Sequence, residues 1–250
     1  MAFDVAPDSY DRFMGRWSSP LAEQLVDRLG LTPESRVLDV GCGPGALTAV
    51  LVERLGAPNV SAVEPSATFR AAARERFPDV DVRQAAAEAL PFEDDVFDAV
   101  AAGLVVPFMS DAVAGLTEMR RVARPGGVVA ATAWAQGRGP LNALWRAAQS
   151  LDRSARDEGL RPGCRPGELE AMFERAELGD VRTEELTVTR TMTSFEDWWE
   201  PVTFGVGPAG DYVRRLDDAA RAALREECTR TLPEAPFDLP VTAFCATGRA

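Results

Sequence analysis

The chain has 250 residues, of which 46% are hydrophobic and 26% charged, as expected for a globular protein with one main domain. It carries 27 basic and 39 acidic residues, a formal net charge of −12, and it contains no His, Lys or Ile, so every basic residue is Arg. Ser-His-Asp and Cys-His catalytic arrangements, His-ligated metals, lysine Schiff bases and a P-loop lysine are therefore excluded.

Net charge, cysteine spacing and the apolar runs give expectations about binding partners and cellular location. The acidic balance argues against a nucleic-acid partner, because phosphate contacts need a basic face. The four cysteines form no CxxC pair, and we expect buried, reduced thiols and no metal centre. The N-terminus lacks a signal-peptide pattern, and the longest apolar runs reach about half of the roughly 20 residues that span a membrane. We therefore expect a cytoplasmic protein without a membrane span.

Residues 1–35 are predicted to form a helical N-terminal cap, with its clearest helix at residues 20–29. Short apolar strands and helices then alternate over residues 36–135. Strands are predicted at residues 36–40, 60–63, 80–84, 97–101 and 127–133, and helices at residues 47–55, 68–76 and 112–122. The strands lack strict alternation, as expected where helices cover both sheet faces. The pattern predicts an α/β fold with a doubly wound, mostly parallel sheet.

The last region, residues 136–250, lacks the regular alternation of strands and helices. Helices are predicted at residues 141–151, 167–176, 195–199 and 217–231, and alternating segments at residues 181–190 and 240–247 can add strands at a sheet edge. Clusters of Gly and Pro at residues 137–140, 161–167 and 205–210 predict hinges. We expect this region to form a helical cap over the substrate and to supply the last strands.

The strongest chemical signal is the segment VLDVGCGPG at residues 37–45, which runs from a predicted strand into a helix. Glycines in such a turn let a ligand approach the backbone closely, and the helix N-terminus offers unpaired N–H groups. Glu64 follows Gly45 by nineteen residues, at the end of the next predicted strand. A carboxylate there can accept hydrogen bonds from both hydroxyls of a ribose.

A nicotinamide-dependent oxidoreductase is one interpretation of this segment, but it is the weaker one. The glycines have the spacing G-x-G-x-G, whereas the dinucleotide fingerprint is G-x-G-x-x-G. Asp39 also precedes the turn directly, and its carboxylate is placed to attract an amino group, which a pyrophosphate does not present.

The segment at residues 37–45 resembles motif I of class I S-adenosylmethionine-dependent methyltransferases. The similarity continues through VEPS (63–66), AEALPF (87–92), FDAV (97–100) and EMRRVARPGG (118–127). The order and spacing are similar to the small-molecule branch that includes the ubiquinone/menaquinone-type enzymes. The resemblance covers about residues 35–135, and residues 10–18 resemble the cap of one bacterial subgroup. It implies a seven-stranded Rossmann-like sheet and S-adenosyl-L-methionine as cofactor.

The resemblance also implies cofactor-binding residues. Asp39 would hold the methionine ammonium group and Glu64 the ribose hydroxyls. The others are Gly41, Cys42, Gly43 and Gly45 in the glycine turn, Pro65, Ser66, Ala87 and Glu88 around the adenine, and Ala102, Gly103 and Leu104 near the methyl donor. One departure is that residues 85–87 read Ala-Ala-Ala where many members have Gly-Asp-Ala, so the adenine contact would fall to backbone groups or to Glu88.

Two further groups of residues have both a functional and a structural interpretation. Arg16 can pair with the methionine carboxylate and Tyr10 can close over the cofactor, or both can serve the packing and surface of the cap. An aromatic cluster in the last region can line a pocket for an apolar or aromatic acceptor, or form the core of the cap. The cluster consists of Phe195, Trp198, Trp199 and Phe204.

The leading functional hypothesis is methyl transfer to an O, N or C atom of a small acceptor. Any general base must be Asp, Glu, Tyr or Cys, and Glu196, Glu200 and Tyr212 qualify only because they lie in the expected substrate region. A reaction driven by proximity alone fits equally well. The alternatives are a protein that binds S-adenosylmethionine for other chemistry, and the nicotinamide oxidoreductase. The oligomeric state and the catalytic residues stay open.

Overall fold

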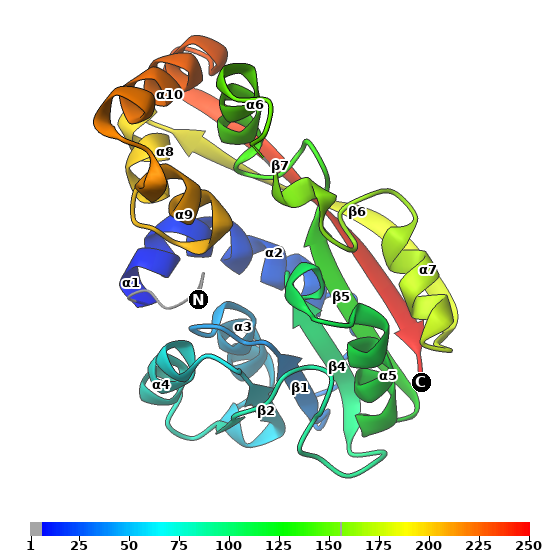
Figure 1. The fold of residues 1–250 in the computed structure, drawn as a ribbon. Coiled ribbons are helices and arrows are strands. Elements are labelled where there is room, and N and C mark those ends of the chain that lie inside the picture. Colours follow the sequence, from blue (N-terminus) through cyan, green and yellow to red (C-terminus); the bar gives the residue numbers. More distant parts are fainter. Residues whose placement is uncertain (1–6, 156) are drawn as a thin grey trace.

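The computed structural model describes residues 7–155 and 157–250, which build one seven-stranded sheet flanked by helices (Figure 1). The strand order is β3-β2-β1-β4-β5-β7-β6. The strands are β1 Val37–Val40, β2 Val60–Val63, β3 Asp81–Arg83, β4 Phe97–Gly103, β5 Ala123–Trp134, β6 Gly179–Met192 and β7 Phe237–Arg249. Strands β1 to β5 are mutually parallel, whereas β7 runs antiparallel to both β5 and β6. The predicted α/β fold is confirmed, with a mixed sheet.

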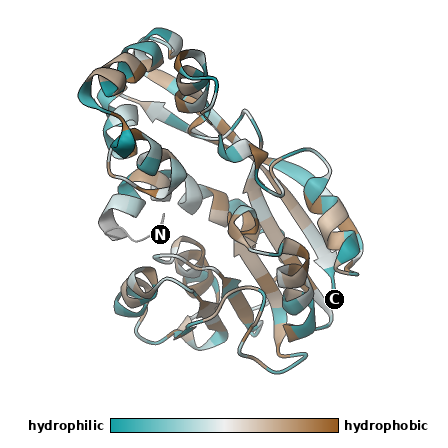
Figure 2. Cartoon of the chain, viewed as in Figure 1, coloured by the Kyte–Doolittle hydropathy of each residue, from teal (hydrophilic) through white to brown (hydrophobic). Residues whose placement is uncertain are grey.

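Helices cover both faces of this sheet. They are α1 Pro7–Tyr10, α2 Arg16–Val26, α3 Ala46–Leu55, α4 Ala67–Arg76, α5 Ala112–Val122, α6 Asn142–Leu151, α7 Glu168–Arg175, α8 Phe195–Val202, α9 Gly207–Arg215 and α10 Asp218–Thr231. Successive strand residues point to opposite faces, so Val37 belongs to the hydrophobic cluster of α2 and α3, and Leu38 to that of α5 and α7. The central strands are accordingly mainly apolar, and β1 is buried along its whole length (Figure 2).

The N-terminal helix begins earlier than the predicted position 20. Helix α2 starts at Arg16 after a π-helical turn, Asp11–Gly15, and Pro20 lies inside it. Proline is usual in the first turn of a helix because it has no N–H to donate, and this preference produced the later predicted start. The additional turn is held by burial of Trp17 and by the ion pair between Arg16 and Asp197. Residues 1–6 of the predicted cap lie outside the described residues.

Helix α9 is a second difference, because residues 205–210 were predicted to be a hinge. Gly207 and Pro208 form the first turn of this helix, where proline is tolerated. Gly210 lies within the helix, and a Cβ at this position would lie 2.4 Å from the backbone carbon of Gly205. The glycine is therefore required for close packing of two backbone segments, and its presence does not indicate flexibility.

The last two strands extend beyond the rest of the sheet. Strand β5 pairs with residues 243–249 of β7, whereas residues 237–242 pair only with β6. This two-stranded extension carries helices α6, α8, α9 and α10 at its far end (Figure 1). Residues 136–250 therefore supply both the antiparallel sheet edge and a helical lobe that lies above α1 and α2. The division at residues 35 and 135 stays a prediction.

Two sequence expectations concern the chain as a whole. Cys42, Cys164, Cys228 and Cys245 are all free and buried, as predicted. Within residues 7–155 and 157–250, each helix is too short or too polar to cross a bilayer.

Replacing Gly210 with Ala is expected to destabilise the helical lobe, since the new Cβ would force the Gly205 backbone to move. Overpacking of this kind costs about 1–3 kcal/mol. Urea unfolding monitored by circular dichroism measures the loss. Gly179→Ala is the matched control, because a Cβ there meets its nearest atom at 3.8 Å. Equal stability of both variants would contradict the packing role of Gly210.

Candidate active site

The glycine turn connects β1 to α3 at the carboxyl edge of the parallel strands. Gly41, Gly43 and Gly45 all have positive φ angles, of 71°, 57° and 101°, which side chains disfavour. A Cβ on Gly41 would lie 2.7 Å from Val105, and one on Gly45 would lie 2.3 Å from Phe77. A Cβ on Gly43 would meet nothing within 4 Å. Two of the glycines therefore pack against protein, while Gly43 faces open space that a ligand can fill.

The carboxylate of Glu64 joins the loops that follow β1 and β2. Its Oε2 accepts a hydrogen bond from the Gly43 N–H at 2.9 Å, and its Oε1 accepts one from the Ser66 N–H at 2.8 Å. Burial raises the pKa of Glu64, while these two N–H groups and Arg70 act to lower it. Because each carboxylate oxygen can accept more than one hydrogen bond, Glu64 retains capacity for hydroxyl donors.

Asp39, at the end of β1, is buried to 1% exposure and accepts a hydrogen bond from the Thr48 hydroxyl at 2.6 Å. Burial raises the pKa of Asp39 to about 7, although the Thr48 hydrogen bond opposes this rise. A buried carboxylate without a cationic partner favours a positively charged ligand, because such a ligand would offset the desolvation cost.

A cavity of about 450 Å³ lies beside these residues and is here called the cofactor cavity. Seven predicted cofactor-binding residues line it, which are Tyr10, Asp39, Gly41, Cys42, Gly43, Gly103 and Leu104. Helix α2 covers it with Ser18, Leu21, Ala22 and Leu25. The hydroxyl of Ser18 is buried and has no hydrogen-bond partner within residues 7–155 and 157–250. An unsatisfied buried hydroxyl at the wall of a cavity is a feature that a polar ligand group would complete.

Several predicted cofactor-binding residues lie outside this lining. Ser66 caps the N-terminus of α4 and accepts a hydrogen bond from the Phe69 N–H at 3.4 Å. Glu88 accepts hydrogen bonds from the Ser110 hydroxyl at 2.8 Å and the Asp111 N–H at 3.1 Å, beside α5. These bonds lower the pKa of Glu88, although partial burial opposes them. The others outside the lining are Arg16, Gly45, Glu64, Pro65, Ala87 and Ala102.

Arg16 is directed away from the cofactor cavity. Its guanidinium donates hydrogen bonds to the Asp197 carboxylate at 2.6 Å and to the Asp197 carbonyl oxygen at 2.7 Å. The structure therefore uses Arg16 to join α2 to α8, because a half-buried guanidinium is best satisfied by a nearby carboxylate. Its predicted pairing with a methionine carboxylate stays a prediction, and Ser18 is the polar group of α2 that faces the cavity.

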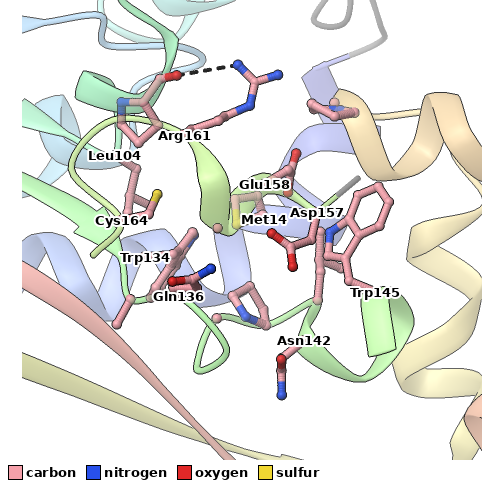
Figure 3. A pocket seen from close by; sticks show the side chains of 18 of the residues that line it. Met14, Leu104, Trp134, Gln136, Asn142, Trp145, Asp157, Glu158, Arg161 and Cys164 are labelled. Carbon is pink, nitrogen blue, oxygen red and sulfur yellow. Dashed lines mark hydrogen bonds between the residues drawn. The ribbon is translucent and has the colours of Figure 1, made fainter. Parts of the chain in front are cut away.

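A larger cavity, of about 880 Å³, adjoins the first and is here called the acceptor cavity (Figure 3). Tyr10 and Leu104 line both cavities, so these residues mark the boundary between them. Its walls come from the loop after β5, helix α6, the turn Glu158–Leu160 and the start of α9. Most of the lining is apolar or aromatic, including Phe108, Trp134 and Trp145, as is usual for sites that bind small organic molecules.

The predicted aromatic cluster lies outside the acceptor cavity. Trp198 and Trp199 are 4% and 5% exposed, and the Phe195 ring stacks on Trp199 with centroids 6.0 Å apart. The Trp198 indole donates to the Pro140 carbonyl at 3.3 Å, and Arg12 covers the Phe204 ring. The structure therefore brings these side chains together in the packing of the lobe. Their role as substrate-binding residues stays a prediction.

The three candidate bases also lie outside both cavity linings. Glu196 pairs with Arg225, Glu200 with Arg12, and the Tyr212 ring packs on Trp145. The acceptor cavity instead presents Asp157 and Glu158, which the sequence analysis missed. They occur in a loop rich in Arg, Gly and Asp, and no spacing or periodicity distinguishes them from the other 37 acidic residues.

Comparison with protein families identifies the domain. Residues 38–131 match the model described as a methyltransferase domain, a range that includes the glycine turn, Glu64, all of β4 and most of β5. The curated relative described below agrees with a methyltransferase domain in this part of the chain.

The malonyl-[acyl-carrier protein] O-methyltransferase of Salmonella typhimurium is 37% identical over 141 residues, covering 56% of this chain and 55% of the relative. The chain thus spans only about half the length of this curated relative. Among solved structures, geranyl diphosphate C-methyltransferase from Streptomyces coelicolor, determined with S-adenosyl-L-homocysteine, superposes with a TM-score of 0.57. It has 17% identity and covers 94% of this chain and 80% of the other.

A third likeness is to the [4+2]-cyclase SpnF, with a TM-score of 0.57 and 22% identity. It covers 92% of this chain and 81% of that protein. At these identities the structural likenesses establish the fold alone.

Ser18→Ala is expected to separate stability from ligand binding. Removing a buried hydroxyl that has no partner should leave the free energy of unfolding unchanged, or raise it by up to about 1 kcal/mol. Loss of a hydrogen bond to the ligand should weaken S-adenosylhomocysteine binding by about 0.5–1.5 kcal/mol. Ser150→Ala is the control, because that hydroxyl donates to the Ala147 carbonyl on α6, away from the cavity. Unchanged affinity in Ser18→Ala would contradict a ligand contact.

The pKa of Asp39 predicts a pH dependence of stability. Its value of about 7 in the folded chain lies above the unfolded value of about 4, so the folded state binds the proton more tightly. Asp39 therefore adds stability below about pH 4 that is lost as the pH rises through about 7, by at most about 1.4 kcal/mol per pH unit. Urea unfolding at several pH values should show a smaller decline in Asp39→Asn, and no such change in the exposed control Asp79→Asn.

Proposed function

We propose that this chain, whose residues 38–131 are an S-adenosylmethionine-dependent methyltransferase domain, transfers the methyl group to an O, N or C atom of a small, mainly apolar acceptor. The observation that carries the proposal is the pair of adjoining cavities, which share Tyr10 and Leu104 as a common wall. One has the glycine turn and the other an apolar lining, so donor and acceptor can meet at that wall.

The residues of the cofactor cavity suit the parts of S-adenosylmethionine. Asp39 would pair with the methionine ammonium group, and the Ser18 hydroxyl would donate to the methionine carboxylate. Glu64 would accept hydrogen bonds from the ribose hydroxyls through its remaining lone pairs. Gly43 allows the ligand to approach the turn, because a side chain there would occupy the open space.

When bound, S-adenosylmethionine supplies a methyl group that its sulfonium already activates. The chain itself then needs to align the acceptor and exclude water, and alignment can account for about 7–11 kcal/mol of barrier lowering. Phe108, Trp134 and Trp145 provide walls that repel water. A reaction in which the cofactor supplies the activated methyl group and the protein supplies alignment suits a chain that contains neither His nor Lys for proton transfer.

The acceptor class is inferred from the lining of the acceptor cavity. Its aromatic walls favour a flat or apolar molecule, which agrees with the small-molecule, ubiquinone/menaquinone-type branch that the sequence resembles. Use of the cofactor for chemistry other than methyl transfer is the alternative, since the same fold occurs in a [4+2]-cyclase.

Calorimetric titration tests the cofactor assignment. S-adenosylmethionine and S-adenosylhomocysteine should bind, and NAD should not. Glu64→Ala should weaken S-adenosylhomocysteine at least about tenfold, or about 1.4 kcal/mol, because the ribose loses its acceptor. Glu53→Ala, on the exposed side of α3, should leave the affinity unchanged. Binding of NAD alone, or an unaltered affinity in Glu64→Ala, would overturn the assignment.

Mass spectrometry of small-molecule extracts tests methyl transfer itself. Incubation with S-adenosylmethionine carrying a deuterated methyl group should yield a product heavier by that labelled group. A protein that binds the cofactor but labels no compound across a broad acceptor panel would favour the non-transfer alternative.

A further inference from the structure

The acceptor cavity has one acidic part in an otherwise apolar lining. Asp157 and Glu158 enter it from the turn before α7, and their carboxylates lie near Met14 and Trp145 (Figure 3). Burial raises the pKa of Glu158 to about 7, whereas Arg161 and Trp145 act to lower it. Placing two carboxylates in the wall of an apolar cavity costs desolvation energy unless a partner offsets it.

The described part of the chain leaves the Asp157 carboxylate incompletely satisfied. Asp157 Oδ2 accepts a hydrogen bond from the Gln149 amide at 3.2 Å, but its Oδ1 is buried and has no hydrogen-bond partner among the residues that the structure describes. Across residues 7–155 and 157–250, neither Asp157 nor Glu158 forms an ion pair within 4.0 Å. A donor or cation from a ligand would supply what the Oδ1 atom lacks.

A second observation comes from Trp145 on α6. This side chain is 6% exposed, it lines the acceptor cavity, and its indole N–H makes no hydrogen bond of normal geometry. Trp134 adds a further aromatic ring to the same lining, whereas the Phe108 ring already faces the Arg161 guanidinium. Aromatic faces attract organic cations, and the attraction strengthens when the cation is removed from water. Both the carboxylates and the rings thus favour a positively charged group.

Arg161 is the cation of this lining, but its guanidinium is already engaged. It donates to the Pro107 carbonyl oxygen at 3.4 Å and lies over the Phe108 ring, 4.8 Å from the centroid. Figure 3 shows this hydrogen bond leading away from the two carboxylates. Among the described lining residues, two carry a carboxyl group and only Arg161 carries a cation, so this part of the cavity favours a cationic group over an anionic one.

We propose that the acceptor is an amine with an apolar or aromatic body, whose ammonium group is bound by Asp157 and Glu158 against the ring of Trp145. This inference rests on the proposed function, because it assigns the acceptor of the same site. The apolar body would lie along the remaining lining, next to the boundary with the cofactor cavity that Tyr10 and Leu104 mark.

The test compares three probes of similar shape, 2-phenylethylamine, 2-phenylethanol and 3-phenylpropanoate. They are titrated calorimetrically at about pH 8 into protein saturated with S-adenosylhomocysteine. The amine should bind at least about tenfold more tightly than the alcohol, and the carboxylate most weakly. Equal or tighter binding of the alcohol or the carboxylate would overturn the proposal.

Two variants assign the effect to the carboxylates. Glu158→Gln and Asp157→Asn should each weaken the amine about tenfold while leaving the alcohol unchanged. Glu174→Gln, at an exposed position on α7, is the matched control and should bind the amine like the unaltered protein. Unfolding curves identify any variant that fails to fold, in which case the other variant decides. Unchanged amine affinity in a folded variant would contradict the assignment.

The pH dependence of amine binding distinguishes direct binding by Glu158 from a purely structural role of this residue. A structural role would not make the affinity change with the ionisation of Glu158. Glu158 is ionised above its pKa of about 7, so amine affinity should rise about tenfold between about pH 6 and about pH 8. The groups facing it are Asp157, Arg161, Tyr10 and Cys164. Burial raises the pKa of Tyr10, and that of Cys164 to about 11, so both stay neutral over this range. Glu158→Gln should abolish the rise.

Two binding measurements distinguish failure of the proposed function from failure of the amine inference. S-adenosylhomocysteine binding is measured first, and the probe titrations are repeated on the protein without it. Absence of S-adenosylhomocysteine binding would count against the proposed function. Absence of amine binding under both conditions would overturn only the amine inference.

Discussion

The parallel pairing of β1 between β2 and β4 is the constraint on which the site depends. Val37 pairs with Val60 on one side and with Ala99 on the other, so the three strands end at the same edge of the sheet. Parallel neighbours buried on both faces cannot slip without exposing apolar side chains. The glycine turn, Glu64 and Gly103 therefore come together although they are far apart in the chain, and the Glu64 carboxylate then ties the first two loops to each other.

The acceptor cavity depends on a different kind of pairing. Because β7 is antiparallel to both neighbours, it can continue with β6 beyond the end of β5 and carry a helical lobe. The start of α9 in this lobe meets the N-terminal segment and the loop after β5 around the cavity. The parallel half of the sheet thus provides the edge at which the glycine turn lies, while the antiparallel half supplies part of the wall of the acceptor cavity.

Much of the fold could be predicted because its signals are local. The helix at residues 112–122 was predicted with the bounds that the structure has, since Asp111 caps its start and apolar residues repeat along one face. The predicted start of α2 and the predicted hinge at residues 205–210 were wrong. Proline usually marks the first turn of a helix and glycine a flexible segment, but packing decides the conformation at Pro20 and Gly210. For the first turn of α2 the deciding neighbour is Asp197, which is distant in sequence. For α9 it is the close approach of the nearby Gly205 backbone, which requires glycine at position 210.

The site residues likewise fall into those placed by local sequence and those placed by contacts between distant segments. The positions of the glycine turn, Asp39 and Glu64 could be predicted from spacing, because strand, turn and helix follow one another directly and a positive φ restricts the residue type. Their roles in binding a cofactor stay predictions. The directions of Arg16 and of the Phe195–Trp199 aromatic residues, the unpartnered Ser18 hydroxyl, and the meeting of Glu158 with Trp145 depend on segments separated by up to 181 residues. Residue spacing encodes contacts within one strand-turn-helix unit, whereas contacts between such units follow from how the whole chain packs.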